Sequence, residues 1–352
     1  MHQRVFAGHK YHNCTREPPS HGTVVRLLRQ RGKSRISLPV VQPLVHAVPR
    51  IILLNSPDGF VYYTKAATRL VHRRMAPSVH AVLPVGGPMS QHYDTLRITP
   101  TDDGYVVMVE MHRPEALNAM NTAMGRELLA CFEGFFWDTQ TRVVILTGAG
   151  DRAFCVGGDL KERQGMSDEA WREQHVIFEQ AAFRLLRCPL PVIAAVEGFA
   201  MGGGCELAVL SDFVVAGETA VFAVPEVTRG IFPGIGGTQL LPRIVGAPFA
   251  KEMIFTGRRV PAEEAKAVGF VNHLVPAGQA RAKALEIATT IAQNGPIAVR
   301  QAKKAIAWGT ETDLETGMRL AIEAYNSTVH TDDRLEGVRA FNERRPPRFQ
   351  GR

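Results

Sequence analysis

From about residue 105 onward, the chain alternates between short apolar runs and longer amphipathic stretches. The runs are rich in Val, Ile and Ala, which is typical of strands that are covered on both faces. We therefore expect strands at 105–111, 142–147, 191–196, 212–216 and 220–223. Apolar residues at helical spacing follow Asn121, a favoured N-cap residue, and continue at 168–186 until Pro189 ends the pattern.

The last part of the chain shows helical spacing almost throughout. Its apolar residues recur every three or four positions at 262–268, 277–293, 297–308 and 311–329. Strands that alternate with helices, followed by a run of helices, predict an α/β fold whose C-terminal region is mainly helical.

Residues 1–88 have a different composition from the rest. They contain 13 Lys and Arg against 2 acidic residues, and repeated prolines interrupt any long helix. Short apolar patches, such as 51–54, are compatible with strands. Three interpretations remain open: a mitochondrial presequence, a disordered extension, or upstream sequence translated from an early start codon, with Met89 as the true first residue. We do not expect function in this segment.

Composition narrows the class of protein. The 352 residues are 45% hydrophobic, enough for a substantial core, and the net charge of +7 arises in the N-terminal extension. The remainder holds 28 basic and 32 acidic residues, so nucleic-acid binding is not expected. The longest apolar stretch, 190–210, contains Glu197 and Glu206, so no membrane span is expected.

Cysteine and histidine positions give no sign of metal or redox chemistry. The five cysteines are scattered and form no CxxC pair, which indicates a reduced, intracellular chain. Cys155 and Cys205 flank the glycine-rich motifs described next, and we interpret both as packing residues. No histidine has ligand spacing and no phosphate-binding or dinucleotide fingerprint is present, so neither a metal nor a nucleotide cofactor is expected.

Candidate chemistry is concentrated in three glycine-rich turns. The segment 202–206, Gly-Gly-Gly-Cys-Glu, follows a predicted strand and opens a helix. Its glycines let a ligand approach main-chain N–H groups, and the helix N-terminus favours negative charge there. Such donors stabilise an oxyanion, and Glu206 stands on the first turn beside them. The other two turns lie at 154–161 and, just after Glu226, at 230–239.

Together these segments resemble the crotonase, or enoyl-CoA hydratase/isomerase, family, over residues 95–351. The resemblance implies a crotonase fold, with a core of repeated ββα units that form a spiral at 89–265. It further implies a helical region at 266–352 that builds homotrimers, which pair into hexamers.

The family pattern assigns roles to particular residues. It implies that the N–H groups of Val156 and Gly203 form the oxyanion hole and that Glu206 and Glu226 are the catalytic acids. We expect Glu226 to act as the base that activates water and Glu206 to donate a proton to C2. The implied substrate-binding residues are Val156, Gly157, Gly158, Asp159 and Gly203, while the segment 114–118 resembles the one that follows the adenosine of coenzyme A.

The implied activity is that of an enoyl-CoA hydratase in fatty-acid β-oxidation, which adds water syn across the 2,3 double bond of a 2-enoyl-CoA thioester. Coenzyme A is then part of the substrate, and no separate cofactor is expected. Val156 and Ile235 are larger than the usual family residues, which predicts a short or compact acyl group. Gly158 replaces an alanine, and this difference is expected to be without consequence.

Several alternatives stay open. The C-terminal segment 332–348 looks like that of the methylglutaconyl-CoA hydratase branch, and isomerase or dehydratase activity also fits the family. Some members of that branch bind RNA, for which Arg300, Lys303 and Lys304 are candidates, although nucleic acid is not the expected partner. Arg344 or Arg345 could contact a coenzyme A phosphate, and a coenzyme A binder without activity is a further alternative. We expect a cytoplasmic location, or the mitochondrial matrix if residues 1–88 are a cleaved presequence.

Overall fold

The computed structural model describes residues 51–56, 59–64 and 87–352, which fall into two units, Met1–His80 and Ala81–Arg352. In the first unit, β1 (Ile51–Ser56) and β2 (Gly59–Thr64) form an antiparallel hairpin, in agreement with the strand expected at 51–54. The three interpretations of residues 1–88, as a presequence, a disordered extension or upstream sequence, mainly concern residues outside the described ranges.

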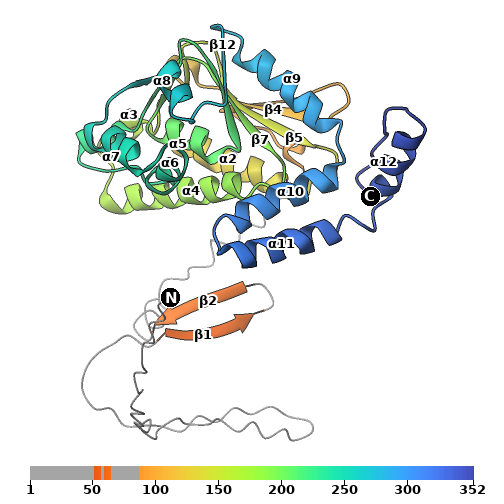
Figure 1. The fold of residues 1–352 in the computed structure, drawn as a ribbon. Helices are drawn as coiled ribbons and strands as arrows, with labels where there is room; N and C mark the ends of the chain where they lie inside the picture. The colour runs from red at the N-terminus through yellow and green to blue at the C-terminus, as the bar shows by residue number, and fades with distance from the viewer. Residues whose placement is uncertain (1–50, 57–58, 65–86) are drawn as a thin grey trace, which may run out of the picture. The chain divides into compact units, whose positions relative to one another are not determined.

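A six-stranded sheet forms the centre of the second unit (Figure 1). All neighbouring strands are parallel except β3, which pairs antiparallel with β4. Every residue of the central strands β5 and β7 is buried, which explains their continuous apolar runs. In spatial order the strands are β12 (His273–Val275), β9 (Phe213–Gly217), β7 (Val192–Val196), β5 (Val143–Gly148), β4 (Val106–Met111) and β3 (Leu96–Pro100).

A second, smaller sheet shows the repeated unit of the fold. Its strands, in order, are β11 (Val260–Pro261), β10 (Val221–Ala223), β8 (Phe199–Met201) and β6 (Ala153–Cys155). The strands β6, β8 and β10 each follow a strand of the large sheet directly and lead into a helical segment. Those segments are α3 (Leu160–Arg163) with α4 (Asp168–Leu186), α5 (Gly203–Leu210), and η3 (Pro225–Arg229) with α6 (Gly237–Val245). Three successive ββα repeats confirm the expected spiral.

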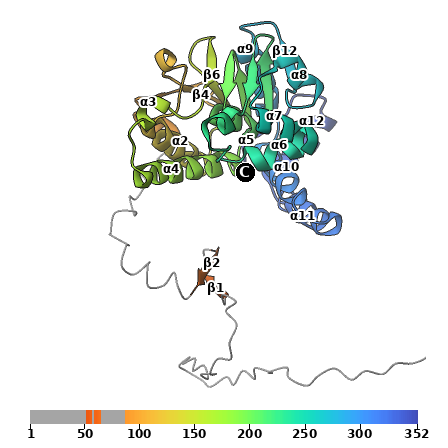
Figure 2. The same cartoon turned by 90° about the vertical axis from the view of Figure 1, so that its left-hand side faces the viewer.

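Helices cover both faces of the large sheet. On one side, α2 (Thr122–Gly134) lies next to α4, and on the other α9 (Ala280–Ala292) packs against β5, β7 and β9 (Figures 1 and 2). The buried face of α9 is a row of alanines at every fourth position, which lets the helix approach the sheet closely. Since β12 and α9 belong to the sheet and its cover, the core continues to residue 292. Both elements lie beyond the core boundary expected at 265.

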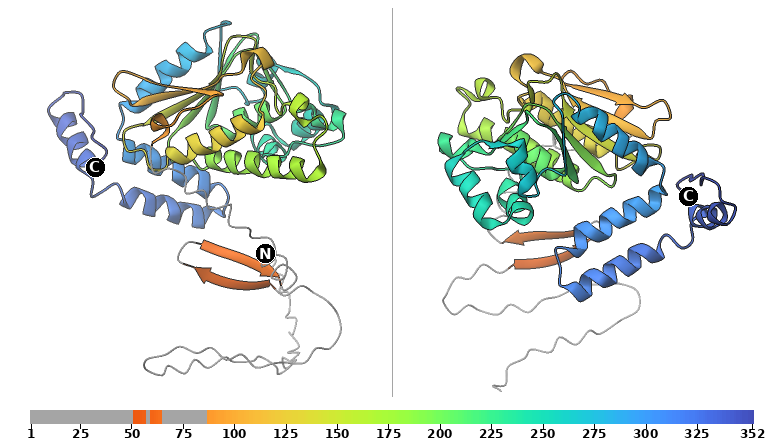
Figure 3. Two further views of the ribbon diagram at one scale, coloured as in Figure 1. Left: turned by 180° about the vertical axis from the view of Figure 1, so that it is seen from behind. Right: turned by 45° about the horizontal axis from the view of Figure 1, so that its top comes forward.

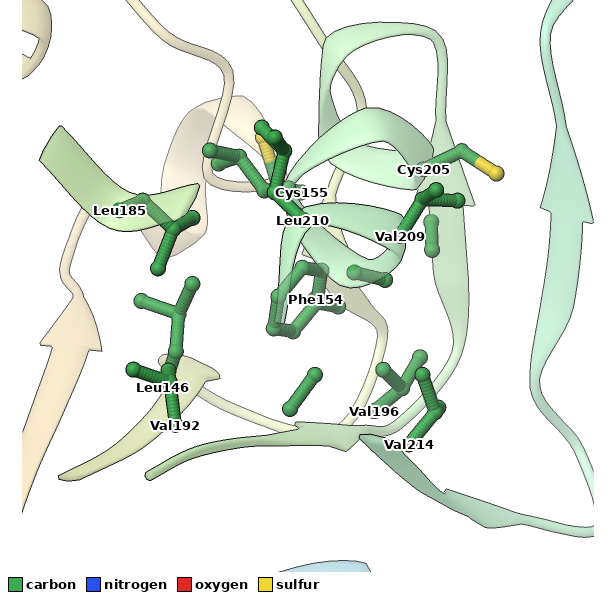
Figure 4. Packing of buried hydrophobic residues seen from close by; sticks show 14 of the residues in the cluster. Leu146, Phe154, Cys155, Leu185, Val192, Val196, Cys205, Val209, Leu210 and Val214 are labelled. Atoms are coloured by element: carbon green, nitrogen blue, oxygen red, sulfur yellow. The ribbon is translucent and has the colours of Figure 1, made fainter. Parts of the chain in front are cut away.

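The helix α5 lies almost in contact with the backbone of β6. A Cβ atom on Gly204 would stand 2.0 Å from the carbonyl oxygen of Cys155, so only glycine permits this approach. Around it, the side chains of Phe154, Cys155 and Leu210 pack with residues of β7 and β9 in one apolar cluster (Figure 4). This packing holds the N-terminus of α5 beside the end of β6.

The C-terminal region consists of α10 (Pro296–Gly309), α11 (Leu314–Asn326) and α12 (Asp332–Asn342). The first two lie side by side (Figure 3). Lys303 Nζ on α10 donates to Asp212 Oδ2 at 2.7 Å, and Arg300 donates to the carbonyl of Thr141, so both bases tie α10 to the core. The remaining short elements of this unit are η1 (Pro88–Ser90), η2 (Pro114–Ala116), α7 (Ala247–Thr256) and α8 (Ala262–Ala267).

Candidate active site

Two adjoining cavities lie where the ββα repeats meet. The larger, of about 820 Å³, is lined by Val156, Gly203 and Glu226, and the smaller, of about 320 Å³, by Glu206. Both cavities share lining residues, namely Gly158, Gly203 and Ile231. Every catalytic, oxyanion-hole and substrate-binding residue expected from the sequence therefore lines one of these adjoining cavities.

Two main-chain segments carry the expected oxyanion donors. Gly203 is the first residue of α5, so its N–H group has no acceptor within the helix. Val156 follows the last residue of β6, and Gly157 then turns the chain with φ of +88°. A Cβ atom on Gly157 would lie 3.1 Å from the nitrogen of Gly203, so the two segments are in close contact. An oxyanion hole needs two main-chain donors that lie close together, so the closeness of these segments is compatible with that role.

Glu206 is fixed in place by the third glycine turn. Its side chain is only 3% exposed, and Oε1 accepts hydrogen bonds from the N–H groups of Ile235 at 2.9 Å and Gly237 at 2.8 Å. Burial raises the pKa of Glu206, and these two donors act in the opposite direction because they stabilise the carboxylate.

The carboxyl group of Glu226 has fewer hydrogen-bond partners than that of Glu206. Its Oε2 is buried and has no hydrogen-bond partner among the described residues. Burial, together with the negative charge of Glu206, raises the pKa of Glu226 to about 7. Gly202, with φ of +54°, leaves room for this carboxyl, since a Cβ atom there would stand 3.0 Å from Oε1. A buried oxygen without a partner is a group that a ligand can satisfy.

The carboxylate of Asp159 has a structural role. Its side chain caps α3 by accepting from the N–H groups of Lys161 and Glu162, and it also accepts from Arg113 Nη1 at 2.9 Å. Arg113 also donates to the carbonyl of Ala119. Because Arg113 is the N-cap residue of η2, its bonds to Asp159 and Ala119 hold η2 in place as part of the cavity wall. The structure thus gives Asp159 a role in positioning the wall.

Several residues of the smaller cavity were missed by the sequence reasoning. Arg163, Trp171 and His175 line it together with Glu206. No motif marks them, because they come from the end of α3 and from α4 and meet only through the packing of these helices.

Other candidate residues are engaged elsewhere. Cys155 and Cys205 are fully buried and burial raises their pKa, which confirms a packing role. Arg345 forms a two-pronged ion pair with Glu336, at 2.6 and 3.0 Å. Within the described part of the chain, no group of three His, Cys, Asp or Glu side chains is arranged to hold a metal ion, and no helix is long and apolar enough to cross a bilayer.

The spiral of ββα units, with donor turns and acidic side chains at the cavity between its repeats, defines a crotonase-type enzyme. Enzymes of this type act on acyl-CoA thioesters. A sequence profile described as enoyl-CoA hydratase/isomerase matches residues 101–352, and the chain belongs to this family.

Similar proteins carry related names. The chain is 45% identical over 247 residues to a putative enoyl-CoA hydratase/isomerase of Bacillus subtilis, covering 70% of this chain and 95% of that protein. It is 36% identical over 299 residues to the human mitochondrial methylglutaconyl-CoA hydratase, covering 80% and 88%. The crystal structure of an enoyl-CoA hydratase from Bacillus anthracis superposes with a TM-score of 0.72 at 44% identity, covering 74% of this chain and 100% of that one.

Proposed function

We propose that this protein is an enoyl-CoA hydratase that adds water syn across the 2,3 double bond of a short or compact 2-enoyl-CoA. The observation that carries the proposal is the presence of two acids, the buried Glu206 and the half-buried Glu226, on adjoining cavities beside the N-terminus of α5. The limited volume of the smaller cavity, which Ile235 lines, supports a compact acyl group.

The hydrogen bonds favour a particular catalytic role for each of the two acids. Two main-chain donors stabilise Glu206 as a carboxylate, whereas Glu226 has an unpaired oxygen and a pKa of about 7. We therefore propose Glu206 as the base that takes a proton from water, while the new C–O bond forms at C3. Glu226 then gives its proton to C2, and the N–H groups of Val156 and Gly203 hold the enolate oxygen. These roles are the reverse of those expected from the sequence alone.

A direct test is the loss of enoyl-thioester absorbance when the full-length protein is mixed with crotonyl-CoA. We expect turnover, with 3-hydroxybutyryl-CoA as the product. A protein that binds crotonyl-CoA but leaves its absorbance unchanged would be the inactive coenzyme A binder considered above, and the proposal would be wrong.

The pH dependence follows from the raised pKa of Glu226. Below about pH 7 the group is protonated in the free protein and can serve as an acid, and above this value it loses that proton. We expect kcat/KM to fall about tenfold per pH unit above about pH 7. A kcat/KM that increases from pH 7 to pH 9 would contradict this assignment.

Related activities remain the alternative. A methylglutaconyl-CoA hydratase, an enoyl-CoA isomerase and an acyl-CoA dehydratase use the same fold, and the human relative carries the first of these names. A second role in RNA binding loses support, because Arg300 and Lys303 are bonded to the core and Lys304 lies over the Trp308 ring. Salt-dependent retention of RNA by the purified protein would instead support a role in RNA binding.

We also propose that the protein forms a homotrimer that pairs into a hexamer. The helices α10, α11 and α12 expose large apolar side chains, and exposed apolar surface of this kind is typical of subunit interfaces. The most prominent are Ile306, Trp308, Leu314, Met318, Ile322, Tyr325, Val338 and Phe341.

Sedimentation is expected to show three or six subunits for the wild type. Replacing both Met318 and Ile322 by Glu should produce monomers, because the charges would have to be buried in the interface. Glu323→Gln, which changes an exposed polar residue of the same helix, is the control. A monomeric wild type would contradict the proposal.

For the location, we propose the cytoplasm, with the mitochondrial matrix as the alternative if residues 1–88 are removed as a presequence. The human relative named as mitochondrial supports the alternative. The intact mass of the protein isolated from its own cells distinguishes a chain that begins at Met1, at Met89, or at a cleavage site between them.

A further inference from the structure

A histidine of α4 packs on the loop that holds Glu206. His175 lines the smaller cavity, as do Gly234 and Ile235 of the loop between η3 and α6. A Cβ atom on Gly234 would stand 2.6 Å from Cε1 of His175 and 3.1 Å from Nε2, so the imidazole ring lies directly on the main chain of this loop. The next residue, Ile235, gives Glu206 one of its two main-chain hydrogen bonds.

The loop has few hydrogen bonds of its own at this point. Within the described part of the chain, residues 232–234 take part in no hydrogen bond between main-chain groups. The N–H group of Ile231 bonds back to η3, and the next main-chain donors, those of Ile235 and Gly237, bond to Glu206. The path of the loop between these bonds therefore depends on side-chain packing, which the ring of His175 supplies at Gly234.

The ring of His175 is itself held on α4. Its Nε2 lies 3.2 Å from Oε1 of Glu179, which is one helical turn further along. The helix is 19 residues long and packs along α2, so it forms a firm support. The contact between His175 and Gly234 thus connects a rigid helix to the donors of Glu206.

The charged surroundings of Glu206 include four other titratable side chains, which are Cys205 of α5, Glu226 of η3, Arg163 of α3 and His175 of α4. Arg163 donates to Gln174 and fills the space beside Gly158. Two neutral replacements of His175 that differ only in the presence of a ring leave the other three groups in place. They therefore separate the packing of the ring from any charge that it carries.

We propose that His175 is a positioning residue of the hydration reaction, whose ring keeps the loop 230–236 in the conformation that directs two main-chain donors at Glu206. This inference rests on the proposed hydratase function and adds a residue that acts through Glu206. Preorganised donors contribute to catalysis only while their geometry is maintained, and a displacement of about 1 Å is enough to cost up to about 100-fold in rate.

The test compares His175→Ala, which removes the ring, with His175→Phe, which keeps a ring against Gly234. We expect His175→Ala to lower kcat for crotonyl-CoA about 30-fold and to change KM less than about threefold, because His175 does not line the larger cavity. His175→Phe should keep more than about a third of the wild-type kcat. Arg172→Ala, which alters an exposed residue of the same helix, is the matched control and should change neither constant.

The pH profile gives a readout that a loss of folded protein does not produce. The two main-chain donors stabilise the carboxylate of Glu206, so their displacement raises the pKa of this group. Because the proposed base acts as a carboxylate, the acidic limb of kcat/KM should move upward by about one pH unit in His175→Ala. The limb should stay in its wild-type position in His175→Phe.

Gly234→Ala tests the same contact from the side of the loop. The three atoms nearest to the added Cβ all belong to the ring of His175, and the backbone of Gly234 is not in the left-handed region. Gly234→Ala should therefore lower kcat about tenfold and shift the acidic limb in the same direction as His175→Ala. In the His175→Ala background the same change should cost less than about twofold, because no ring remains to be displaced.

Three outcomes would overturn the inference while the hydratase function stands. They are a His175→Phe protein as impaired as His175→Ala, a fall in kcat without a shift of the acidic limb, and equal losses from Gly234→Ala in both backgrounds. Gly234→Ala alone still decides the question by its pH profile if His175→Ala does not fold. A wild type that fails to hydrate crotonyl-CoA would instead contradict the proposed function, and the inference would fall with it.

Discussion

Replacing Glu226 with Gln is expected to lower kcat for crotonyl-CoA hydration by about 1,000-fold, and Glu206→Gln is expected to do the same. The amide keeps the size of the carboxyl but can neither accept a proton from water nor exchange one with C2. Because both residues act in the same hydration step, the double variant should be little worse than either single variant. Initial rates at saturating crotonyl-CoA measure the effect.

The control for this pair is Glu218→Gln, which alters an exposed glutamate just after β9 and should leave kcat unchanged. Melting temperatures of all variants show whether they are folded. If Glu226→Gln or Glu206→Gln kept more than about a tenth of the wild-type kcat, its carboxyl would not take part in the proton transfers.

Gly204→Ala is expected to be the most damaging single-methyl change for the fold, with a loss of about 3 kcal/mol or more in the free energy of unfolding. The added Cβ would stand 2.0 Å from the carbonyl oxygen of Cys155, and a backbone atom cannot move aside as a flexible side chain can. Any relief must shift α5 away from β6. The same shift would separate the donors of Gly203 and Val156, so the folded fraction should also lose activity.

Gly295→Ala is the matched control, because its φ is −58° and the nearest atom to the added Cβ lies 3.8 Å away. Urea unfolding of the two variants gives the comparison. A Gly204→Ala protein as stable as Gly295→Ala would mean that α5 does not pack on β6 as described.

The regular elements of the fold could be predicted because their residues repeat a local signal. The helix expected at 168–186 agrees with α4 at Asp168–Leu186. The side chain of Asn121 caps α2 by accepting a hydrogen bond from the N–H group of Met124, as its position before the helix indicated. The strands β5 and β7 were recognisable from their unbroken apolar runs. Glu206 was found for a similar reason, because a glycine turn and a helix start are adjacent in sequence.

Other features depend on contacts between distant segments. The strands β6 and β8 have three residues each, too few for a pattern of alternation to be visible. The packing of α9 on the sheet, beyond the boundary expected at 265, was not foreseen because its alanine face is recognisable as a sheet cover only when the sheet is present.

The residues that line the smaller cavity were hidden for the same reason. Arg163 acquires its position from Gln174 and Trp171, and the space at Gly158 has meaning only beside that arginine. Likewise, the hydrogen bonds that distinguish Glu206 from Glu226 come from a loop about thirty positions away from Glu206, which sequence spacing does not reveal.

The most direct measurement is the mass spectrum of the product formed when the wild-type protein acts on crotonyl-CoA in water enriched in heavy oxygen. Two acids and a pair of main-chain donors on two adjoining cavities predict a 3-hydroxyacyl-CoA that has gained one water and carries the heavy oxygen at C3. Release of free coenzyme A, or an isomer of unchanged mass, would show that the site performs another reaction and would contradict the account.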